Sequence, residues 1–565
     1  MNVQSYTAII IIAGLIVLTA AIMIIRNNRD IKKQFDSRVI KGWGKEPKFK
    51  QTSDEFECIS HFFRDRSKGK SGYYVDDITW NDCDFDRIFK QMNAAFSSPG
   101  EDTLYTWLRT PQTDNEVLSE REKMIRHFSE DTDGRRKVLR ILNDIGRMKK
   151  MSMYDYIRRL SDAEKIGTVK YIVLCILMCV GIVMLFIHPV AALAILIPVI
   201  VANIAVYLRQ KDRTEVYIKS FSCVLKLAEA ADKLSACDDE IVSSYRDELK
   251  NLTGKLTALR RGAFFVTTSG SNGTGLGDAL LEYFKILFHI DLIKFDQMIT
   301  AYRGNEDVCM RIFEIAGGLD AAIAVASWRE YLGNWCEPEL TFAENGFLEV
   351  ADMYHPLISE SVPVTYSGSG GNLITGSNAS GKSTFLKETA IASILAQSVH
   401  TVPAGSYRAS FFRTYTSMAL RDDIDSGESY FIVEIRSLKR ILDAAQSEGA
   451  PVLGIVDEVL RGTNTIERIS ASSQILRRLT DTNAVIFAAT HDIELSYILE
   501  KYYNNYHFTE QITDGDVRFD YVLREGRATS RNAIALLTIS GYGEDISRAA
   551  REQAERFEQT GEWRL

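Results

Sequence analysis

Residues 373–384 read LITGSNASGKST, and this stretch decides the fold of the C-terminal part of the chain. Gly376 and the run Gly381–Ser383 satisfy the pattern GxxxxGK[ST], in which glycines let backbone N–H groups point at phosphate oxygens. An apolar strand over Asn372–Thr375 enters the loop, and a helical stretch over Thr384–Ala396 leaves it. Strand, glycine-rich loop and helix in this order predict the phosphate-binding loop of an α/β domain.

The last residues of the loop carry the chemistry. Lys382 is expected to reach the β- and γ-phosphates of a bound nucleotide, because an ammonium group there faces the phosphate oxygens. The hydroxyl of Ser383 is expected to be a ligand of Mg²⁺. The loop therefore predicts ATP and Mg²⁺ as cofactors.

Two further apolar strands end in polar residues. Val452–Glu458 reads VLGIVDE, and a buried parallel strand is expected to be continuously apolar in this way. Asp457 would hold the Mg²⁺ shell, and Glu458 would polarise the attacking water. A strand over Ala484–Ala489 leads to His491, which can donate a hydrogen bond to a γ-phosphate oxygen. A doubly wound sheet aims such strand-end groups at its ligand, so these residues predict a single ATPase site.

These stretches resemble the MutS family of ABC-type ATPases. The matching segments are the P-loop GSNASGKSTFLKE (376–388), the following turn VHTVPA (399–404), the signature DDIDSGESYFIVEI (422–435), the extended Walker B and D-loop DEVLRGTNT (457–465) and the histidine switch AATHDIEL (488–495). A weaker resemblance to the family's helical core covers Asp76–Phe128, and the stronger one runs over Ile315–Ser547.

The resemblance implies a set of site residues. The residues expected to bind the nucleotide are Gly376, Ser377, Asn378, Ala379, Ser380, Gly381, Lys382, Ser383, Thr384 and Ser429. Glu458 and His491 are expected to be catalytic, and Ser383 and Asp457 are expected to bind Mg²⁺. In the family, the serine at the position of Ser429 contacts ATP across a dimer, so a homodimer is expected. Ser377 and Ala379 depart from the family's usual Pro and Met.

Three hydrophobic segments predict membrane spans, at Ala8–Ile25, Tyr171–Ile187 and Val190–Leu208. Positive charges follow the first segment from Arg26 to Lys33, which places the N-terminus outside and the ATPase domain in the cytoplasm of a multi-pass cell-membrane protein. A cleaved signal peptide is the alternative for the first segment, and a buried hairpin in a soluble core is the alternative for the other two.

The expected fold class is an α/β P-loop NTPase domain of the ABC/MutS type at the C-terminal end, preceded by an all-α core domain and three transmembrane helices. The expected domains are an N-terminal anchor over 1–33, the helical core in two parts over 50–165 and 210–340, a transmembrane hairpin over 170–209, and the ATPase domain over 341–565.

Composition limits the partners. The formal net charge of −8 argues against a chain-wide attraction to nucleic acid. The cysteines form no CxxC pair, so neither a zinc site nor a disulfide framework is expected. Hydrophobic segments stand where the family has its mismatch-reading domain and its DNA-clamping insertion, so we expect no mismatch recognition and at most weak, phosphate-directed DNA binding.

Two functions stay open on the sequence alone. In the first, a membrane-anchored dimeric ATPase moves its helical core, with DNA as the substrate of that movement. In the second, the same ATPase remodels a membrane or a protein partner and has no role on DNA. The sequence does not identify the protein partner.

Overall fold

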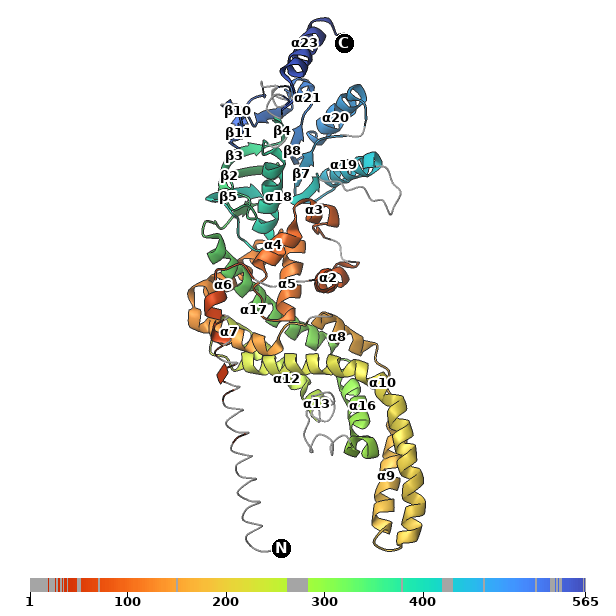
Figure 1. The fold of residues 1–565 in the computed structure, drawn as a ribbon. Helices are drawn as coiled ribbons and strands as arrows, with labels where there is room; N and C mark the ends of the chain where they lie inside the picture. The colour runs from red at the N-terminus through yellow and green to blue at the C-terminus, as the bar shows by residue number, and fades with distance from the viewer. Residues whose placement is uncertain are drawn as a thin grey trace. The chain divides into compact units, whose positions relative to one another are not determined.

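The computed structural model describes the chain in segments, which are 39–47, 52–69, 72–148, 151–261, 283–377, 380–418, 430–460, 463–513, 516–528 and 541–561, with isolated positions besides. Contacts among these segments divide the chain into two compact units. The first comprises Met1–Lys68, Met92–Thr106 and Met124–Tyr331, and the second comprises Gly69–Gln91, Trp107–Lys123 and Leu332–Leu565. Each unit is described by itself (Figure 1).

The first unit is helical. Its helices are α2 (Ser53–Ser67), α7 (Thr132–Ile145), α8 (Met153–Ser161), α9 (Val169–Met184), α10 (Pro189–Ser235), α11 (Glu240–Ser244), α12 (Arg246–Lys255), α13 (Thr257–Arg260), α16 (Ile290–Tyr302) and α17 (Glu306–Leu332). Helices α5 (Ser98–Arg109) and α6 (Asn115–Glu130) are divided between the two units. This confirms a helical composition for the stretch that precedes the α/β domain.

A close approach between α5 and α17 holds the middle of this unit together. A Cβ atom built on Gly317 of α17 would lie 2.6 Å from the carbonyl oxygen of Pro99, so only glycine fits there. The fully buried Asp320, one turn further on, accepts hydrogen bonds from the backbone N–H groups of Phe96 (3.0 Å) and Ser97 (2.7 Å). These bonds satisfy backbone donors beside the first turn of α5, where intrahelical acceptors are missing.

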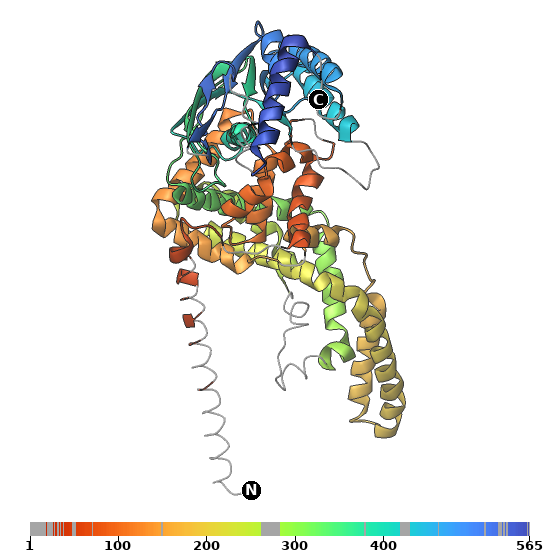
Figure 2. The same cartoon turned by 45° about the horizontal axis from the view of Figure 1, so that its top comes forward.

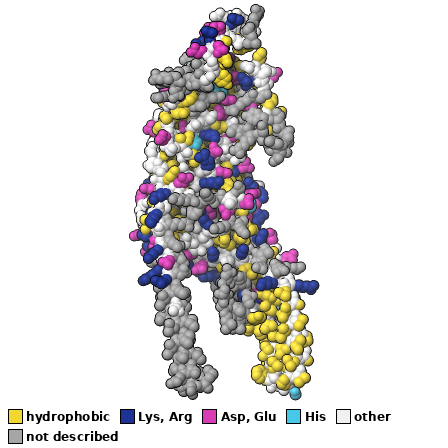
Figure 3. Space-filling model, in the orientation of Figure 1, with side chains coloured by type: hydrophobic (Ala, Val, Ile, Leu, Met, Phe, Trp, Pro, Cys, Tyr) yellow, Lys and Arg dark blue, Asp and Glu magenta, His cyan; other side chains and the backbone are white. Residues whose placement is uncertain are grey.

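Helices α9 and α10 form a hairpin, and both cartoon views show α9 beside the first part of α10 (Figures 1 and 2). The chain turns at residues 185–187, and Pro189 begins α10 at a position where its missing N–H costs nothing. Large hydrophobic side chains are exposed along the hairpin, with Phe186 at 88 % and Val190 at 85 %. Figure 3 shows this apolar surface in yellow, covering α9 and the first half of α10.

The expectation of three spanning helices is not met in the described part of the chain. One helix there, Pro189–Lys211, is long and apolar enough to cross a membrane. Helix α9 is apolar but has 16 residues, which at 1.5 Å per residue is about 24 Å, shorter than a hydrocarbon core of about 30 Å. The segment Ala8–Ile25 lies outside the described residues.

The second unit is an α/β structure. Its six-stranded sheet has the order β12-β9-β4-β8-β7-β6, and a four-stranded sheet has the order β1-β5-β2-β3. The strands of the large sheet are β4 (Gly371–Thr375), β6 (Arg413–Ser417), β7 (Val452–Asp457), β8 (Val485–Thr490), β9 (Tyr503–His507) and β12 (Arg524–Glu525). Those of the smaller sheet are β1 (Glu339–Thr341), β2 (Phe347–Met353), β3 (Val364–Ser369) and β5 (Ser406–Ser410), and β10 (Glu510–Thr513) pairs with β11 (Asp516–Phe519).

Five of the six strands in the large sheet run parallel, and only the short β12 pairs antiparallel. The helices of this unit are α3 (Asp77–Asp82), α4 (Phe85–Met92), α18 (Lys382–Ser398), α19 (Tyr430–Gln446), α20 (Thr465–Leu479), α21 (Ile493–Ile498) and α23 (Glu544–Thr560). The expected strands at Asn372–Thr375, Val452–Glu458 and Ala484–Ala489 and the helix after the loop are confirmed to within two residues at each end.

Successive side chains of a strand point to opposite faces of the sheet, and this alternation places the helices. On β8, Ile486 belongs to the apolar cluster that includes Ile441 of α19 and Leu476 of α20. Its neighbour Phe487 instead packs edge-on against Phe385 of α18, with ring centroids 5.7 Å apart. Helix α18 therefore covers one face of the sheet, and α19 and α20 cover the other.

Candidate nucleotide site

The phosphate-binding loop follows the fully buried strand β4 and ends where α18 begins. Gly376 has φ 145°, and a Cβ atom there would lie 2.8 Å from the carbonyl oxygen of Phe508. Gly381 is the N-cap of α18 and has φ 109°, a backbone conformation that residues with a Cβ atom rarely adopt. Both glycines of the sequence pattern are thus required by backbone geometry, which confirms the expected strand–loop–helix arrangement.

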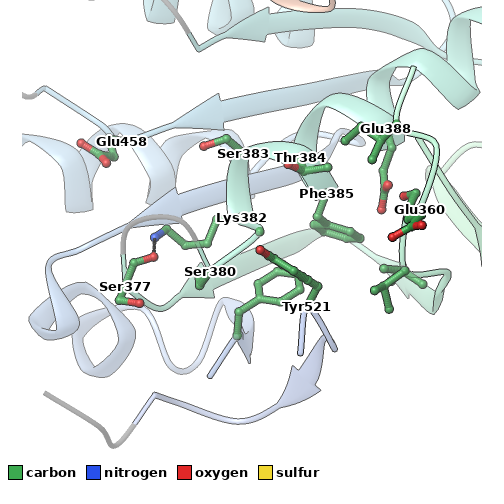
Figure 4. Close-up of a pocket in the computed structure, with 16 residues that line it drawn as sticks. Glu360, Ser377, Ser380, Lys382, Ser383, Thr384, Phe385, Glu388, Glu458 and Tyr521 are labelled. Carbon is green, nitrogen blue, oxygen red and sulfur yellow. Dashed lines mark hydrogen bonds between the residues drawn. The ribbon is translucent and has the colours of Figure 1, made fainter. Parts of the chain in front are cut away.

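Lys382 folds back over the loop that precedes it. Its Nζ atom donates hydrogen bonds to the carbonyl oxygens of Gly376 (2.8 Å) and Ser377 (2.7 Å), and its side chain is 4 % exposed (Figure 4). The Oγ atom of Ser380 is buried and has no hydrogen-bond partner among the described residues. A buried ammonium group and an unsatisfied hydroxyl beside a helix N-terminus fit a phosphate ligand, since both can donate to its oxygens.

Ser383 and Asp457 meet at the carboxyl edge of the sheet. The Ser383 hydroxyl donates to Oδ2 of Asp457 at 2.6 Å, and Asp457 is 8 % exposed. Strand β8 lies between the P-loop strand β4 and β7, yet the parallel register brings Thr375, Thr490 and Asp457 to the same edge. Two adjacent oxygen donors of this kind fit Mg²⁺, which prefers hydroxyl, carboxylate and water ligands.

Glu458 and His491 form the second polar pair of the site. Nε2 of His491 lies 2.8 Å from Oε1 of Glu458, and both side chains are partly exposed. The backbone N–H of Glu458 donates to the carbonyl of Ala489 at 3.0 Å, so the residue is held at the end of the β7–β8 ladder. The structure brings the two residues expected to be catalytic into direct contact.

The backbone after β7 is strained. Glu458 has φ 59° and Leu460 has φ 61°, a region that costs a non-glycine residue of order 1 kcal/mol or more. Glu434 of α19, which is 3 % exposed, accepts a hydrogen bond from the backbone N–H of Leu460 at 2.6 Å. This buried carboxyl, which belongs to the signature segment, connects α19 to the loop that follows Glu458.

A bidentate ion pair supports the histidine. Arg468 of α20 donates to both carboxylate oxygens of Asp492, at 2.6 Å and 2.8 Å. Asp492 directly follows His491, and its backbone N–H donates to Oγ1 of Thr490 at 3.0 Å. Bidentate pairs fix orientation as well as distance, so this pair holds the turn that presents His491.

A pocket of about 450 Å³ lies over the loop. Its described lining residues are Ile358, Glu360, Ser361, Val362, Val364, Ser377, Ser380, Gly381, Lys382, Ser383, Thr384, Phe385, Glu388, Glu458, Phe508 and Tyr521. In Figure 4, Glu458 lies at one end of the labelled residues, and Glu388 and Glu360 lie at the other. Burial raises the pKa of the Glu388 carboxyl well above its usual range.

Most of the expected site residues meet in this pocket. Gly376 lies beside the lining residue Phe508, and Asp457 accepts a hydrogen bond from the lining residue Ser383. His491 lines an adjoining pocket of about 190 Å³ that shares Glu458. Asn378, Ala379 and Ser429 lie outside the described residues, so their expected roles stay predictions.

The residues that sequence reasoning missed are Glu388, Glu434 and the Arg468–Asp492 pair. Glu388, Glu434 and Asp492 lie within the quoted segments and Arg468 lies outside them. The motif patterns do not signal their roles, because these roles depend on packing and pairing between elements distant in the sequence.

One cysteine also has neighbours that the sequence did not indicate. In the first unit, donor atoms of Cys58, His61 and Asp155 lie within 4.8 Å of one another, and Nδ1 of His61 lies 2.9 Å from Asp155. This His–Asp pair joins α2 to α8 and explains the cluster without an ion.

The fold and the geometry define a nucleotide-binding domain of the P-loop ATPase type. Comparison with known proteins points to a more specific likeness, since residues 372–558 match the family described as MutS domain V. The DNA mismatch repair protein MutS 2 of Haloarcula marismortui is 33% identical over 184 residues, which is 32% of this chain and 19% of that protein.

Two other relatives have similar identities to this chain. The DNA mismatch repair protein MutS of Natronomonas pharaonis is 36% identical over 178 residues, or 31% of this chain and 20% of that protein. The MutS 2 protein of Halobacterium salinarum is 34% identical over 184 residues, or 32% of this chain and 21% of that protein. The chain thus spans about a fifth of the length of these curated relatives. The expected resemblance to MutS is confirmed for the ATPase-type domain.

Proposed function

We propose that this protein is a MutS-family ATPase that binds and hydrolyses ATP with Mg²⁺. The observation that carries the proposal is the convergence of Lys382, the Ser383–Asp457 pair and the Glu458–His491 pair around one pocket. Ser383 stands at the start of α18 after β4, whereas Asp457, Glu458 and His491 stand at the ends of the neighbouring strands β7 and β8. Together with Lys382 these residues supply phosphate donors, oxygen ligands and a general base.

The proposed chemistry follows from the residues present. Lys382 exchanges its bonds to the loop carbonyls for bonds to the phosphates, and the N-terminus of α18 faces the same negative charge. Ser383 and Asp457 would hold Mg²⁺, which neutralises charge on the phosphates when bound. Glu458 accepts a proton from the attacking water, and His491 donates a hydrogen bond to the γ-phosphate.

The proposed ATPase is tested with the full chain in detergent. We expect ATP binding and slow hydrolysis that both require Lys382, so Lys382→Ala lowers ATP affinity at least about a hundredfold, as expected for removal of a charge facing the phosphates. Lys387→Ala is the matched control, because Lys387 lies on the same helix and pairs with Asp84 instead. A wild-type protein that neither binds nor hydrolyses ATP would refute the proposal.

ATP is proposed to act on a dimer and to move the helical core. This part rests on the resemblance to MutS, in which Ser429 of one subunit would complete the ATP site of the other.

A membrane location is the next part of the proposal. It is supported by the apolar surface of α9 and α10, since a soluble protein rarely exposes so large a continuous hydrophobic patch. Lys165 and Lys170 precede the apolar run Tyr171–Ile187, and Arg209 follows the apolar run Val190–Leu208, as expected for ends that remain on the cytoplasmic side.

An environment-sensitive fluorophore tests the membrane location. Attached at a cysteine replacing Phe186, it should show blue-shifted emission when the protein is reconstituted in lipid vesicles. The same fluorophore attached at a cysteine replacing Glu544 on α23 should show the emission that is typical of a water-exposed position. Water-like emission from both positions would contradict insertion of the hairpin.

The helical core has two proposed substrates. The MutS relatives carry a mismatch-repair name, which favours movement on DNA. The exposed apolar hairpin favours the alternative, in which the ATPase remodels a membrane or protein partner. Duplex binding whose affinity falls steeply with salt would support the DNA role. ATPase activity that responds to lipid composition but not to DNA would support the alternative.

A further inference from the structure

Glu388 places a carboxyl group at the far end of the nucleotide pocket. It lies six residues beyond Lys382 on α18, which at 1.5 Å per residue is about 9 Å along the helix axis. The residue is 3 % exposed and lines the pocket, with its carboxyl group at the end opposite Glu458 in Figure 4. A separation of this size is on the scale of the distance from the β-phosphate of a nucleotide to its base.

Within the described part of the chain, the Glu388 carboxyl makes no hydrogen bond or ion pair with another residue. A buried polar group usually has a partner, because leaving one unsatisfied costs about 1–3 kcal/mol. The residues proposed to act on the phosphates do not account for Glu388, since Lys382 and Glu458 lie on the side of Figure 4 away from it. A polar group held this way in a pocket is expected to bind a ligand group.

The same pocket offers apolar surface for a planar base. Phe385 lies one turn before Glu388 on α18, and Val362, Val364 and Ile358 also line the cavity. Phe385 and Val364 are buried, so the walls are preformed. Apolar walls with one convergent polar group are typical of small-molecule sites, where the polar group gives specificity.

We propose that the carboxylic acid of Glu388 selects adenine, by donating its O–H to a ring nitrogen and accepting a hydrogen bond from the 6-amino group. This inference rests on the proposed nucleotide site and names the residue that reads the base. A protonated carboxyl group offers one donor and one acceptor, as the amide of Gln does. The N7/N6 edge of adenine offers the complementary acceptor and donor, whereas the N7/O6 edge of guanine offers two acceptors.

Burial keeps the acid in the form that this pairing needs. The pKa of Glu388 is raised by desolvation, so the neutral acid is favoured in the folded protein. An ionised carboxylate could only accept hydrogen bonds and would not match adenine N7. The environment of Glu388 and the chemistry of adenine therefore agree.

The test compares binding of ATP and GTP to the full chain in detergent. Wild-type protein should bind ATP at least about tenfold more tightly than GTP, because one bidentate hydrogen-bonded pair is expected to discriminate by about this factor. Glu388→Leu removes both hydrogen-bonding atoms at similar volume, so the ratio should fall to within about threefold while binding of GTP is retained. Glu388→Gln, which keeps one donor and one acceptor, should preserve the preference for ATP.

A measurement on wild-type protein covers the case in which Glu388→Leu does not fold. ITP, which has a 6-oxo group in place of the amine, should bind on the order of tenfold more weakly than ATP. Equal binding of ATP and ITP would overturn the proposal, as would a preference for ATP that survives in Glu388→Leu. A wild-type protein that binds no nucleoside triphosphate would refute the nucleotide site itself, so the two failures are distinguishable.

Discussion

Nε2 of His491 lies 2.8 Å from Oε1 of Glu458, so the proposed phosphate sensor and the proposed general base are within ion-pair distance of each other. A bound γ-phosphate would compete with Glu458 for His491. Formation of the ATP complex would then release the carboxylate toward the attacking water, which couples the position of the base to the presence of the third phosphate.

His491→Asn tests this coupling. We expect kcat for ATP hydrolysis to fall about a hundredfold, because a donor to the developing charge is lost, while binding of ADP is unchanged. His507→Asn is the matched control, since His507 on β9 bonds to the carbonyl of Gly526 and does not line the pocket. Equal kcat for wild type and His491→Asn would show that the histidine has no part in turnover.

The contact between Ser383 and Asp457 predicts that removing the Ser383 hydroxyl weakens the binding of Mg²⁺. Ser383→Ala removes one of two adjacent oxygen donors, so the Mg²⁺ concentration for half-maximal activity should rise about tenfold or more. Ser393→Ala, on the same helix but bonded to Thr414, should leave the Mg²⁺ titration unchanged. An unaltered titration in Ser383→Ala would rule out the hydroxyl as a ligand.

Mutant mixing tests the composite site. Lys382→Ala and Ser429→Ala should each be inactive alone, because each disables both sites of a homodimer. After mixing and random assembly, about half of the dimers combine the two chains and keep one intact site, so about a quarter of wild-type activity should return. Activity that stays at the level of the single mutants would argue against Ser429 acting across a dimer.

His355 predicts a pH dependence of stability. Burial lowers the pKa of this histidine to about 4, with Lys387 contributing to the shift. The unfolded chain, with a histidine pKa near 6.5, therefore binds more protons between pH 4 and 6.5. The free energy of unfolding should fall as pH drops through this window, by up to about 3 kcal/mol from this residue.

Denaturant unfolding of wild type and His355→Asn at pH 7 and pH 4.5 measures this contribution. Asn keeps an acceptor close to the position of Nδ1, which accepts from the backbone N–H of Leu357 at 3.2 Å. Wild type should lose more stability than the variant on acidification. Identical losses would mean that His355 does not carry the effect.

The sequence predicted the phosphate-binding site because its geometry is local. Gly376 and Gly381 need unusual backbone angles that the motif itself reveals, and the apolar runs before Asp457 and His491 match buried strands. Backbone angles and strand burial that depend on consecutive residues can be predicted from the sequence of those residues. The order of the strands and the contact between Glu458 and His491 come instead from pairing across the sheet.

The helical part was less predictable. The expected helical core over 210–340 gave no sign of the break after Ser235, where Asp239 caps α11 and also bonds to His127 from a distant helix. The apolar run Tyr171–Ile187 did not reveal that α9 ends at Met184. Glu388 looked like one more polar residue on a helix, because its burial depends on the strands packed beside it.

The central claim is ATP hydrolysis with Glu458 as the base, and the most direct test is the fate of radiolabelled ATP bound to Glu458→Gln. We expect ATP affinity within about threefold of wild type, turnover lowered at least a hundredfold, and the bound nucleotide recovered as ATP. Glu448→Gln, an exposed position outside the pocket, should hydrolyse ATP at the wild-type rate. Hydrolysis at the wild-type rate by Glu458→Gln would contradict the account.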